Sequence, residues 1–146
     1  MPASGIKLLD ANIWLALAFS DHQHHLKATR WFSSQADGSC AFCRVTQMAF
    51  LRHLTNSVIM GKFVQSQQAA WKRYDTFLSD ARVIFLSETT GVKSVFRSFS
   101  QSDSPSHARW TDAYLAAFAV AANLQLATFE KAFPSFAGLD LSVLDS

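Results

Sequence analysis

The hydrophobic and polar positions of this chain fall into two alternating patterns. Short apolar runs, of the length expected for buried strands, occur at residues 6–9, 40–43, 83–86, 126–128 and 139–144. Between them, an apolar run at residues 13–18 belongs to a helix that starts directly after the first strand. Apolar residues also recur at helical spacing, as in a helix that buries one face, at residues 21–32, 45–54, 66–78 and 92–99. Strands separated by helices predict a parallel sheet covered on both faces. We therefore expect an α/β fold of three layers, α/β/α, around a short central parallel sheet.

One segment, residues 113–122, is apolar without interruption. It predicts a helix with no polar face, which protein must cover on several sides, and it is too short to cross a bilayer. Asn123 is suited to end this helix in the left-handed conformation, before the strand at residues 126–128. Asp112 and Glu130 therefore bracket a helix, a turn and a strand.

The composition is that of one folded domain, which we place over residues 1–146. Hydrophobic residues make up 49% of the chain, which suits a well-filled core. The net charge of +2 allows a polyanionic partner without predicting one. No apolar run near the start is long enough for a signal peptide or a membrane span, so we expect a soluble cytoplasmic protein without a membrane partner. Its two cysteines are expected to be reduced.

Three acidic residues stand where a strand or a loop gives way to the next element. Asp10 follows the first strand, Asp112 opens the apolar helix, and Glu130 follows the strand at residues 126–128. In a parallel sheet the carboxyl ends of the strands line a common crevice, where clustered carboxylates need a cation with a preference for oxygen ligands. Mg²⁺ or Mn²⁺ bound there could activate water for phosphodiester hydrolysis. Each acid also has a purely structural explanation, as a helix cap, a helix-dipole partner or a surface residue.

Four segments carry a resemblance to a known family. They read LLDANIWLAL at residues 8–17, FCRVTQMAFLRHLTN at 42–56, WTDAYLAAFA at 110–119 and LATFEKAFPSFAGLDLSVL at 126–144. Together, and in this order, they resemble a PIN-domain ribonuclease of the VapC toxin type. The resemblance implies a PIN-like fold, an endoribonuclease dependent on Mg²⁺ or Mn²⁺, and a VapB-type antitoxin as partner. It also implies a homodimer and structured RNA substrates such as tRNA or rRNA.

The resemblance assigns roles to individual residues. Asp10, Asp112 and Glu130 match the family's metal-binding acids, while Asn12 and Thr128 match small polar positions that orient a ligand or a metal-bound water. The sequence departs from the family pattern at two places. Glu130 replaces the usual aspartate, and the family glutamate expected within the helix at residues 45–54 is absent near Ala49. We expect this loss to weaken the metal site rather than to abolish activity.

Basic and aromatic side chains near these motifs are candidates for RNA contacts. Arg44, Arg52 and Lys131 flank the acidic positions and could neutralise phosphates. Trp110 and His107 could contact an unpaired base, but a tryptophan at this position is expected in the core.

Two other readings of the sequence remain open. The missing glutamate allows a PIN-fold module that binds RNA or protein without cutting. Cys40 and Cys43 have the spacing of a redox pair or of half a zinc site, which histidines at residues 22, 24 and 25 could complete. Buried reduced cysteines are the simpler explanation.

Overall fold

The computed structural model describes residues 5–144, in which five parallel strands form one sheet. The strands are β1 (Lys7–Leu9), β2 (Cys40–Phe42), β3 (Val83–Phe85), β4 (Gln125–Thr128) and β5 (Asp140–Val143). Their order is β3-β2-β1-β4-β5, so that β1 is central and pairs with both β2 and β4. In a parallel sheet every strand ends at the same edge, which places the residues after β1 and β4 side by side.

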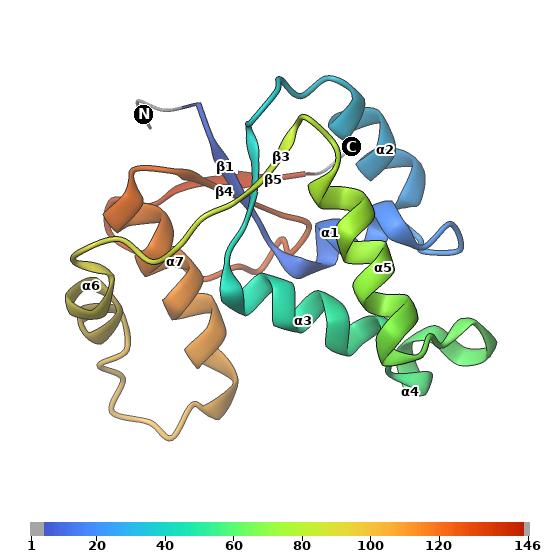
Figure 1. Ribbon diagram of the computed structural model, residues 1–146. Helices are drawn as coiled ribbons and strands as arrows, with labels where there is room; N and C mark the ends of the chain where they lie inside the picture. The colour runs from blue at the N-terminus through green and yellow to red at the C-terminus, as the bar shows by residue number, and fades with distance from the viewer. Residues whose placement is uncertain (1–4, 145–146) are drawn as a thin grey trace.

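Helices cover both faces of this sheet (Figure 1). They are α1 (Ala11–Ala18), α2 (His25–Ser33), α3 (Arg44–Leu54), α4 (Ser57–Met60), α5 (Gln67–Leu78), α6 (Val92–Phe99) and α7 (Trp110–Ala122), with short 3₁₀ helices η1 (Gly61–Phe63) and η2 (His107–Arg109). In Figure 1, α6 and α7 lie on one side of the sheet, and α1, α2, α3 and α5 on the other. The predicted three-layer α/β/α arrangement with a short parallel sheet is confirmed.

The alternation of side chains along each strand divides the core into two clusters. Leu9 and Phe42 point into the cluster shared with α1, α3 and α5, where the Trp14 ring stacks on Phe42 at 3.8 Å between centroids. Leu8 and Ala41 point into the cluster shared with α6 and α7. Burial on both faces explains why these strands are short uninterrupted apolar runs.

The apolar segment predicted to be a covered helix is the body of α7. Six of its residues are buried, and Asn123 ends it with φ 58° and ψ 49°, as predicted from the left-handed cap. Because its neighbours are the sheet, β4 and α6, α7 has no need of a polar face. Across residues 5–144, no helix is long and apolar enough to cross a membrane.

Candidate functional site

The carboxyl ends of β1 and β4 bring Asp10 and Thr128 together. Leu9 pairs with Ala127 in the ladder, and the backbone N–H of Asp10 donates to the Ala127 carbonyl at 2.9 Å. Asp10, the residue after β1, therefore lies level with Thr128, the last residue of β4. Two segments more than a hundred residues apart in sequence meet here because they are adjacent parallel strands.

Thr128 links the two acidic segments through its hydroxyl group. The side chain is fully buried, and Oγ1 donates a hydrogen bond of 2.9 Å to Oδ2 of Asp10. The same oxygen accepts a bond of 3.0 Å from the backbone N–H of Glu130. The hydroxyl thus holds one carboxylate in place and sets the direction in which the chain leaves β4 towards the other.

Asp10 occupies the position before α1, yet its side chain makes no capping hydrogen bond to that helix's second or third N–H. Burial raises the pKa of its carboxyl group, while hydrogen bonds from Thr128 and the backbone of Ala11 and the charge of His53 act in the opposite direction. The Asp10 carboxylate is therefore held by Thr128 and does not cap α1.

Asp112 lies in the first turn of α7 and shares this electrostatic environment. Burial is the largest cause that raises its pKa, to about 6, followed by the negative charges of Glu130 and Asp10, while Arg109 lowers it. The three acids are thus close enough for Asp112 to experience the repulsion of the other two. Carboxylates gathered in this way are stabilised by a proton or by a cation.

The donor chemistry of this edge fits a hard divalent cation, because the three acids offer only oxygen ligands. In the part of the chain from residue 5 to residue 144, however, no group of three or more His, Cys, Asp or Glu side chains is arranged so as to hold a metal ion. The side chains that could offer oxygen ligands to such an ion are Asp10, Asp112 and Glu130.

The remaining residues assigned by the sequence differ in their exposure. Asn12, in the first turn of α1, is exposed, whereas Thr128 is buried. Ala49 is partly buried on α3, and its neighbour Phe50 is fully buried in the core between α3 and the sheet. Neither side chain carries an oxygen, so α3 contributes no carboxylate where the family glutamate is expected.

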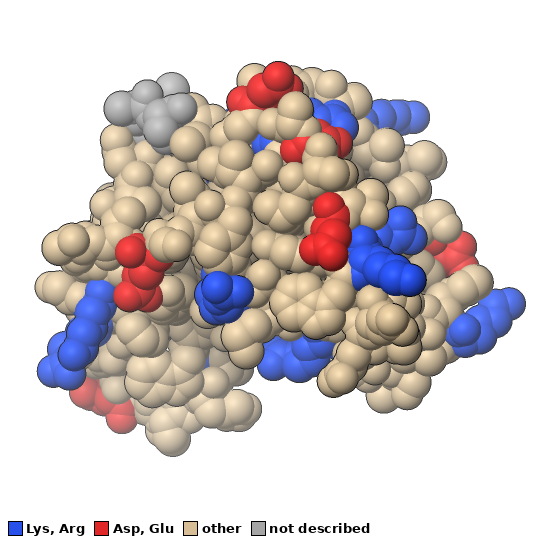
Figure 2. Space-filling model, viewed as in Figure 1, with Lys and Arg blue, Asp and Glu red and all other residues tan. Residues whose placement is uncertain are grey.

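The three basic candidates are all exposed. Arg44, at the start of α3, donates to Oε1 of the buried Gln47 at 2.6 Å, and its guanidinium lies over the Phe85 ring. Arg52 lies in the last turn of α3, and Lys131 follows Glu130. On the face of the molecule that Figure 2 shows, Lys and Arg side chains are scattered, and some lie beside Asp or Glu, in keeping with the small net charge.

Sequence reasoning missed two side chains near the acids. His53 lies on α3 and is close enough for Asp10 to act on its pKa, which burial nevertheless lowers. It follows Ala49 by one helical turn, a spacing that puts both residues on the same face and could have revealed it. His24 stacks on Phe129 with ring centroids 4.5 Å apart, and so packs against the segment between Thr128 and Glu130.

One sequence-based expectation is wrong in this region, and one alternative is excluded. Trp110 is not a core residue, since 56% of its surface is exposed. It is the first residue of α7 and precedes the buried residues of that helix, which begin at Ala113. The two cysteines are free and buried, but Cys40 packs in the α1–α3–α5 cluster and Cys43 in the α6–α7 cluster. Side chains on opposite faces of a sheet cannot form a redox pair or share a zinc ion.

Comparison with known proteins finds relatives over nearly the whole chain. The PIN domain family matches residues 7–139. Ribonuclease VapC41 of Mycobacterium tuberculosis is 39% identical over 142 residues, which cover 94% of this chain and 97% of that protein. Ribonuclease VapC29 of the same organism is 32% identical over 140 residues, which cover 94% of this chain and 94% of that protein.

Solved structures with low sequence identity share the fold. VapBC2 from Rickettsia felis, bound to a DNA fragment from its promoter, matches with a TM-score of 0.66 and 15% identity over 96% of this chain and 99% of that chain. The sarcin-ricin loop cleaving toxin VapC20 of Mycobacterium tuberculosis matches with a TM-score of 0.63 and 15% identity over 87% of this chain and 92% of that chain. These chains therefore share the fold although few of their residues are identical.

Proposed function

This chain belongs to the PIN-domain family of VapC ribonucleases, and from this membership we propose that Asp10, Asp112 and Glu130 bind Mg²⁺ or Mn²⁺ to hydrolyse RNA phosphodiester bonds. The observation that carries the proposal is the meeting of β1 and β4 at one edge of the sheet, where the Thr128 hydroxyl donates to the Asp10 carboxylate two residues before Glu130. Burial, and then the negative charges of Glu130 and Asp10, also raise the pKa of Asp112 to about 6, so the three acids repel one another. A bound cation would relieve this repulsion, and relief of repulsion between carboxylates is what drives such sites to bind divalent ions.

The chain's own residues would hold and orient the reacting groups. When bound, a divalent cation makes a water more acidic and stabilises charge on a phosphoryl oxygen. Thr128 would keep the Asp10 carboxylate fixed by its hydrogen bond, and Asp112 lies in the first turn of α7, where it interacts electrostatically with Asp10. Asn12 is exposed at the start of α1, and we propose that it orients a water or the substrate. In-line attack by water would leave a 5′-phosphate on the product.

We further propose that this protein is the toxin of a pair with a VapB-type antitoxin, that it forms homodimers in the cytoplasm, and that it cuts structured RNA such as tRNA or rRNA. Its structural relatives include a toxin-antitoxin complex from Klebsiella pneumoniae, with a TM-score of 0.63. Exposed apolar side chains on α4 and η1, among them Val58 and Phe63, supply surface for protein partners. Arg44, Arg52 and Lys131 are proposed to contact RNA phosphates.

A second candidate function is a PIN-fold module that binds RNA or protein without cutting. It is favoured by the absence of a carboxylate at Ala49 and by the lack, within residues 5–144, of a preformed group of three metal ligands. Such a site needs rearrangement before an ion can be held, which would lower its affinity for metal.

One experiment separates the two candidates. The purified protein is incubated with total RNA in the presence of Mg²⁺, Mn²⁺ or a chelator, alongside the Asp10→Asn variant. The nuclease is expected to cut RNA only with a cation and only with Asp10 intact. Cleavage that persists in chelator and in the variant would exclude the carboxylate mechanism, and RNA retention without cleavage by the wild type would favour the binding module.

A further inference from the structure

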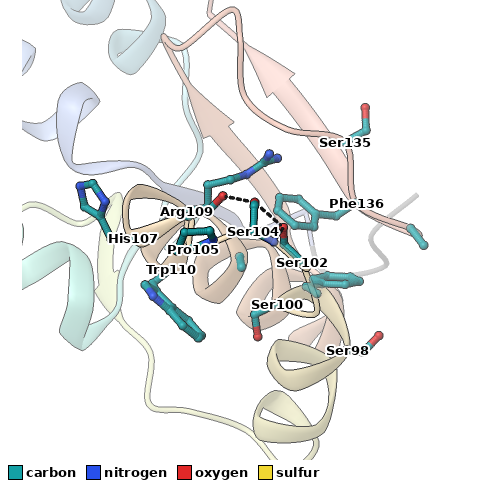
Figure 3. A pocket seen from close by; sticks show the side chains of 14 residues that line it. Ser98, Ser100, Ser102, Ser104, Pro105, His107, Arg109, Trp110, Ser135 and Phe136 are labelled. Atoms are coloured by element: carbon teal, nitrogen blue, oxygen red, sulfur yellow. Dashed lines mark hydrogen bonds between the residues drawn. The ribbon is translucent and has the colours of Figure 1, made fainter.

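A cavity of about 710 Å³ lies beside the start of α7, outside the cluster of acids. It is formed by the carboxyl end of α6, the serine-rich segment before η2, the start of α7 and the segment at residues 135–137 (Figure 3). Its volume falls within the range of about 300–1,000 Å³ typical of sites that hold small ligands. It is therefore large enough to admit one nucleotide of a longer strand.

The lining combines aromatic faces with neutral hydrogen-bonding groups. Phe99 and Phe136 lie with their ring centroids 4.9 Å apart, and the largely exposed Trp110 contributes a third aromatic ring. In Figure 3, Trp110 and Phe136 flank the pocket on different sides. Nucleobases without a pairing partner are held in proteins chiefly by stacking on such rings.

Hydroxyl groups form a connected chain along the same pocket. Oγ of Ser104 is 2.9 Å from Oγ of Ser102 and 3.0 Å from Oγ of Ser106, as the dashed lines in Figure 3 indicate. A hydroxyl can donate or accept, and this chain can reverse the direction of its bonds at little cost. It is suited to a ligand edge that carries both donors and acceptors, as a base edge does.

The pocket is lined by basic side chains and lies next to the acidic residue Asp112. Arg109 and His107 are among the fourteen lining residues, and none of these residues is acidic. The Arg109 charge also acts on Asp112, and Ala113, which lines the pocket, directly follows Asp112 in α7. A strand whose phosphate lies at the acids would therefore place a neighbouring nucleotide at the pocket.

On these grounds we propose that this pocket binds an unpaired nucleobase of the RNA next to the phosphate that is cut, and so selects the cleavage site. The proposal rests on the proposed ribonuclease function and adds a determinant of specificity to it. Trp110 and Phe136 stack on the base, the serine hydroxyls contact its edge, and Arg109 contacts the adjoining phosphate.

The first test measures where the enzyme cuts. Wild type, Trp110→Ala, Phe136→Ala and Ser104→Ala are incubated with a pool of short single-stranded RNAs of randomised sequence, and the cut ends are sequenced. Trp71→Ala serves as a matched control, because Trp71 is also exposed (47%) but lies on α5. The wild type is expected to prefer particular bases at one position beside the cut, and the pocket variants to lose that preference with KM raised about tenfold.

The second test measures binding without cleavage. Anisotropy of fluorescein-labelled oligoadenylate and oligouridylate is followed with Asp10→Asn alone and combined with Trp110→Ala or Trp71→Ala. We expect Trp110→Ala to weaken binding about tenfold and Trp71→Ala to leave it within about twofold. Because Trp110 and Ser104 are exposed, these variants are expected to fold even where Phe136→Ala does not.

The outcomes distinguish this inference from the ribonuclease proposal. If the wild type cuts RNA and the exposed pocket variants keep its base preference and KM, the pocket assignment is wrong while the nuclease stands. If the wild type binds RNA through Trp110 without cutting any of it, the pocket stands and the nuclease fails. If the pocket variants bind RNA normally but no longer bind the antitoxin, the cavity is a protein-docking site and the proposal is overturned.

Discussion

The hydroxyl of Thr128 donates a hydrogen bond of 2.9 Å to the Asp10 carboxylate across 118 positions of sequence. This bond joins the carboxyl ends of two central strands, and the Glu130 N–H extends it. A buried threonine thus supports both acids of the adjacent segments.

Replacing Thr128 by Val tests this support. The isosteric change leaves Oδ2 of Asp10 without its donor, and loss of a buried hydrogen-bond partner costs about 1–3 kcal/mol of the free energy of unfolding. Because the carboxylate is then free to rotate, the cleavage rate at fixed Mg²⁺ is expected to fall at least tenfold. Denaturant unfolding and single-turnover cleavage measure the two effects.

Thr128→Ser keeps the hydroxyl and is expected to retain most of the cleavage rate. Thr29→Val is the matched control, since Thr29 is exposed on α2 and bonds only within that helix. Wild-type stability and activity in Thr128→Val would show that the bond does not support the site.

Replacing Asp112 by Asn is expected to stabilise the metal-free protein in a pH-dependent way. The pKa of Asp112 is raised from 3.8 to about 6, so its ionisation opposes folding; the penalty is absent below pH 3.8, grows as the pH rises, and is complete above about 6. With allowance for the partial exposure of the carboxyl group, Asp112→Asn should raise the free energy of unfolding by about 1 kcal/mol more at about pH 7.5 than at about pH 4.

Denaturant unfolding in chelator at the two pH values measures this difference. Added Mg²⁺ should stabilise the wild type and have less effect on Asp112→Asn, because the ion binds only the folded site. A variant that is equally stabilised at both pH values would contradict the ionisation argument.

Ala49→Glu is expected to strengthen metal binding by restoring an acid to α3. Ala49 precedes His53 by one turn, and His53 is near Asp10, so a longer side chain at Ala49 is directed towards the same crevice. The Mg²⁺ concentration for half-maximal cleavage should fall at least threefold. Met48→Glu is the control, because it adds the same charge at the neighbouring, exposed position 48. Equal effects of the two variants would contradict a role of the carboxylate introduced at position 49 as a metal ligand.

Lys131→Gln is expected to weaken RNA binding uniformly across sequences. The logarithm of the RNA-binding constant falls linearly with the logarithm of the salt concentration. If the Lys131 ammonium group neutralises one phosphate, the slope of this line should become shallower by about one unit in Lys131→Gln. Binding is measured in the Asp10→Asn background at several salt concentrations. Lys62→Gln, on η1, is the control, and an unchanged slope for Lys131→Gln would exclude the contact.

The sequence by itself was sufficient for the α/β class, the parallel sheet, the cap at Asn123 and the family. These features depend on local periodicity and on short motifs, which can be recognised from the sequence alone. The family membership is confirmed by relatives that span nearly the whole chain. The acids at the ends of β1 and β4 could also be named, because strand ends meet at one edge in any parallel sheet.

Only the tertiary structure decided which side chains share an environment. It separated Cys40 from Cys43 onto opposite faces, exposed Trp110, and set His53 near Asp10. Each of these depends on strand register or on how a helix is rotated against the sheet, which no local pattern encodes. The effect of Glu130 and Asp10 on the pKa of Asp112 also depends on the tertiary structure. Their charges act through space between segments that only the packed sheet brings together.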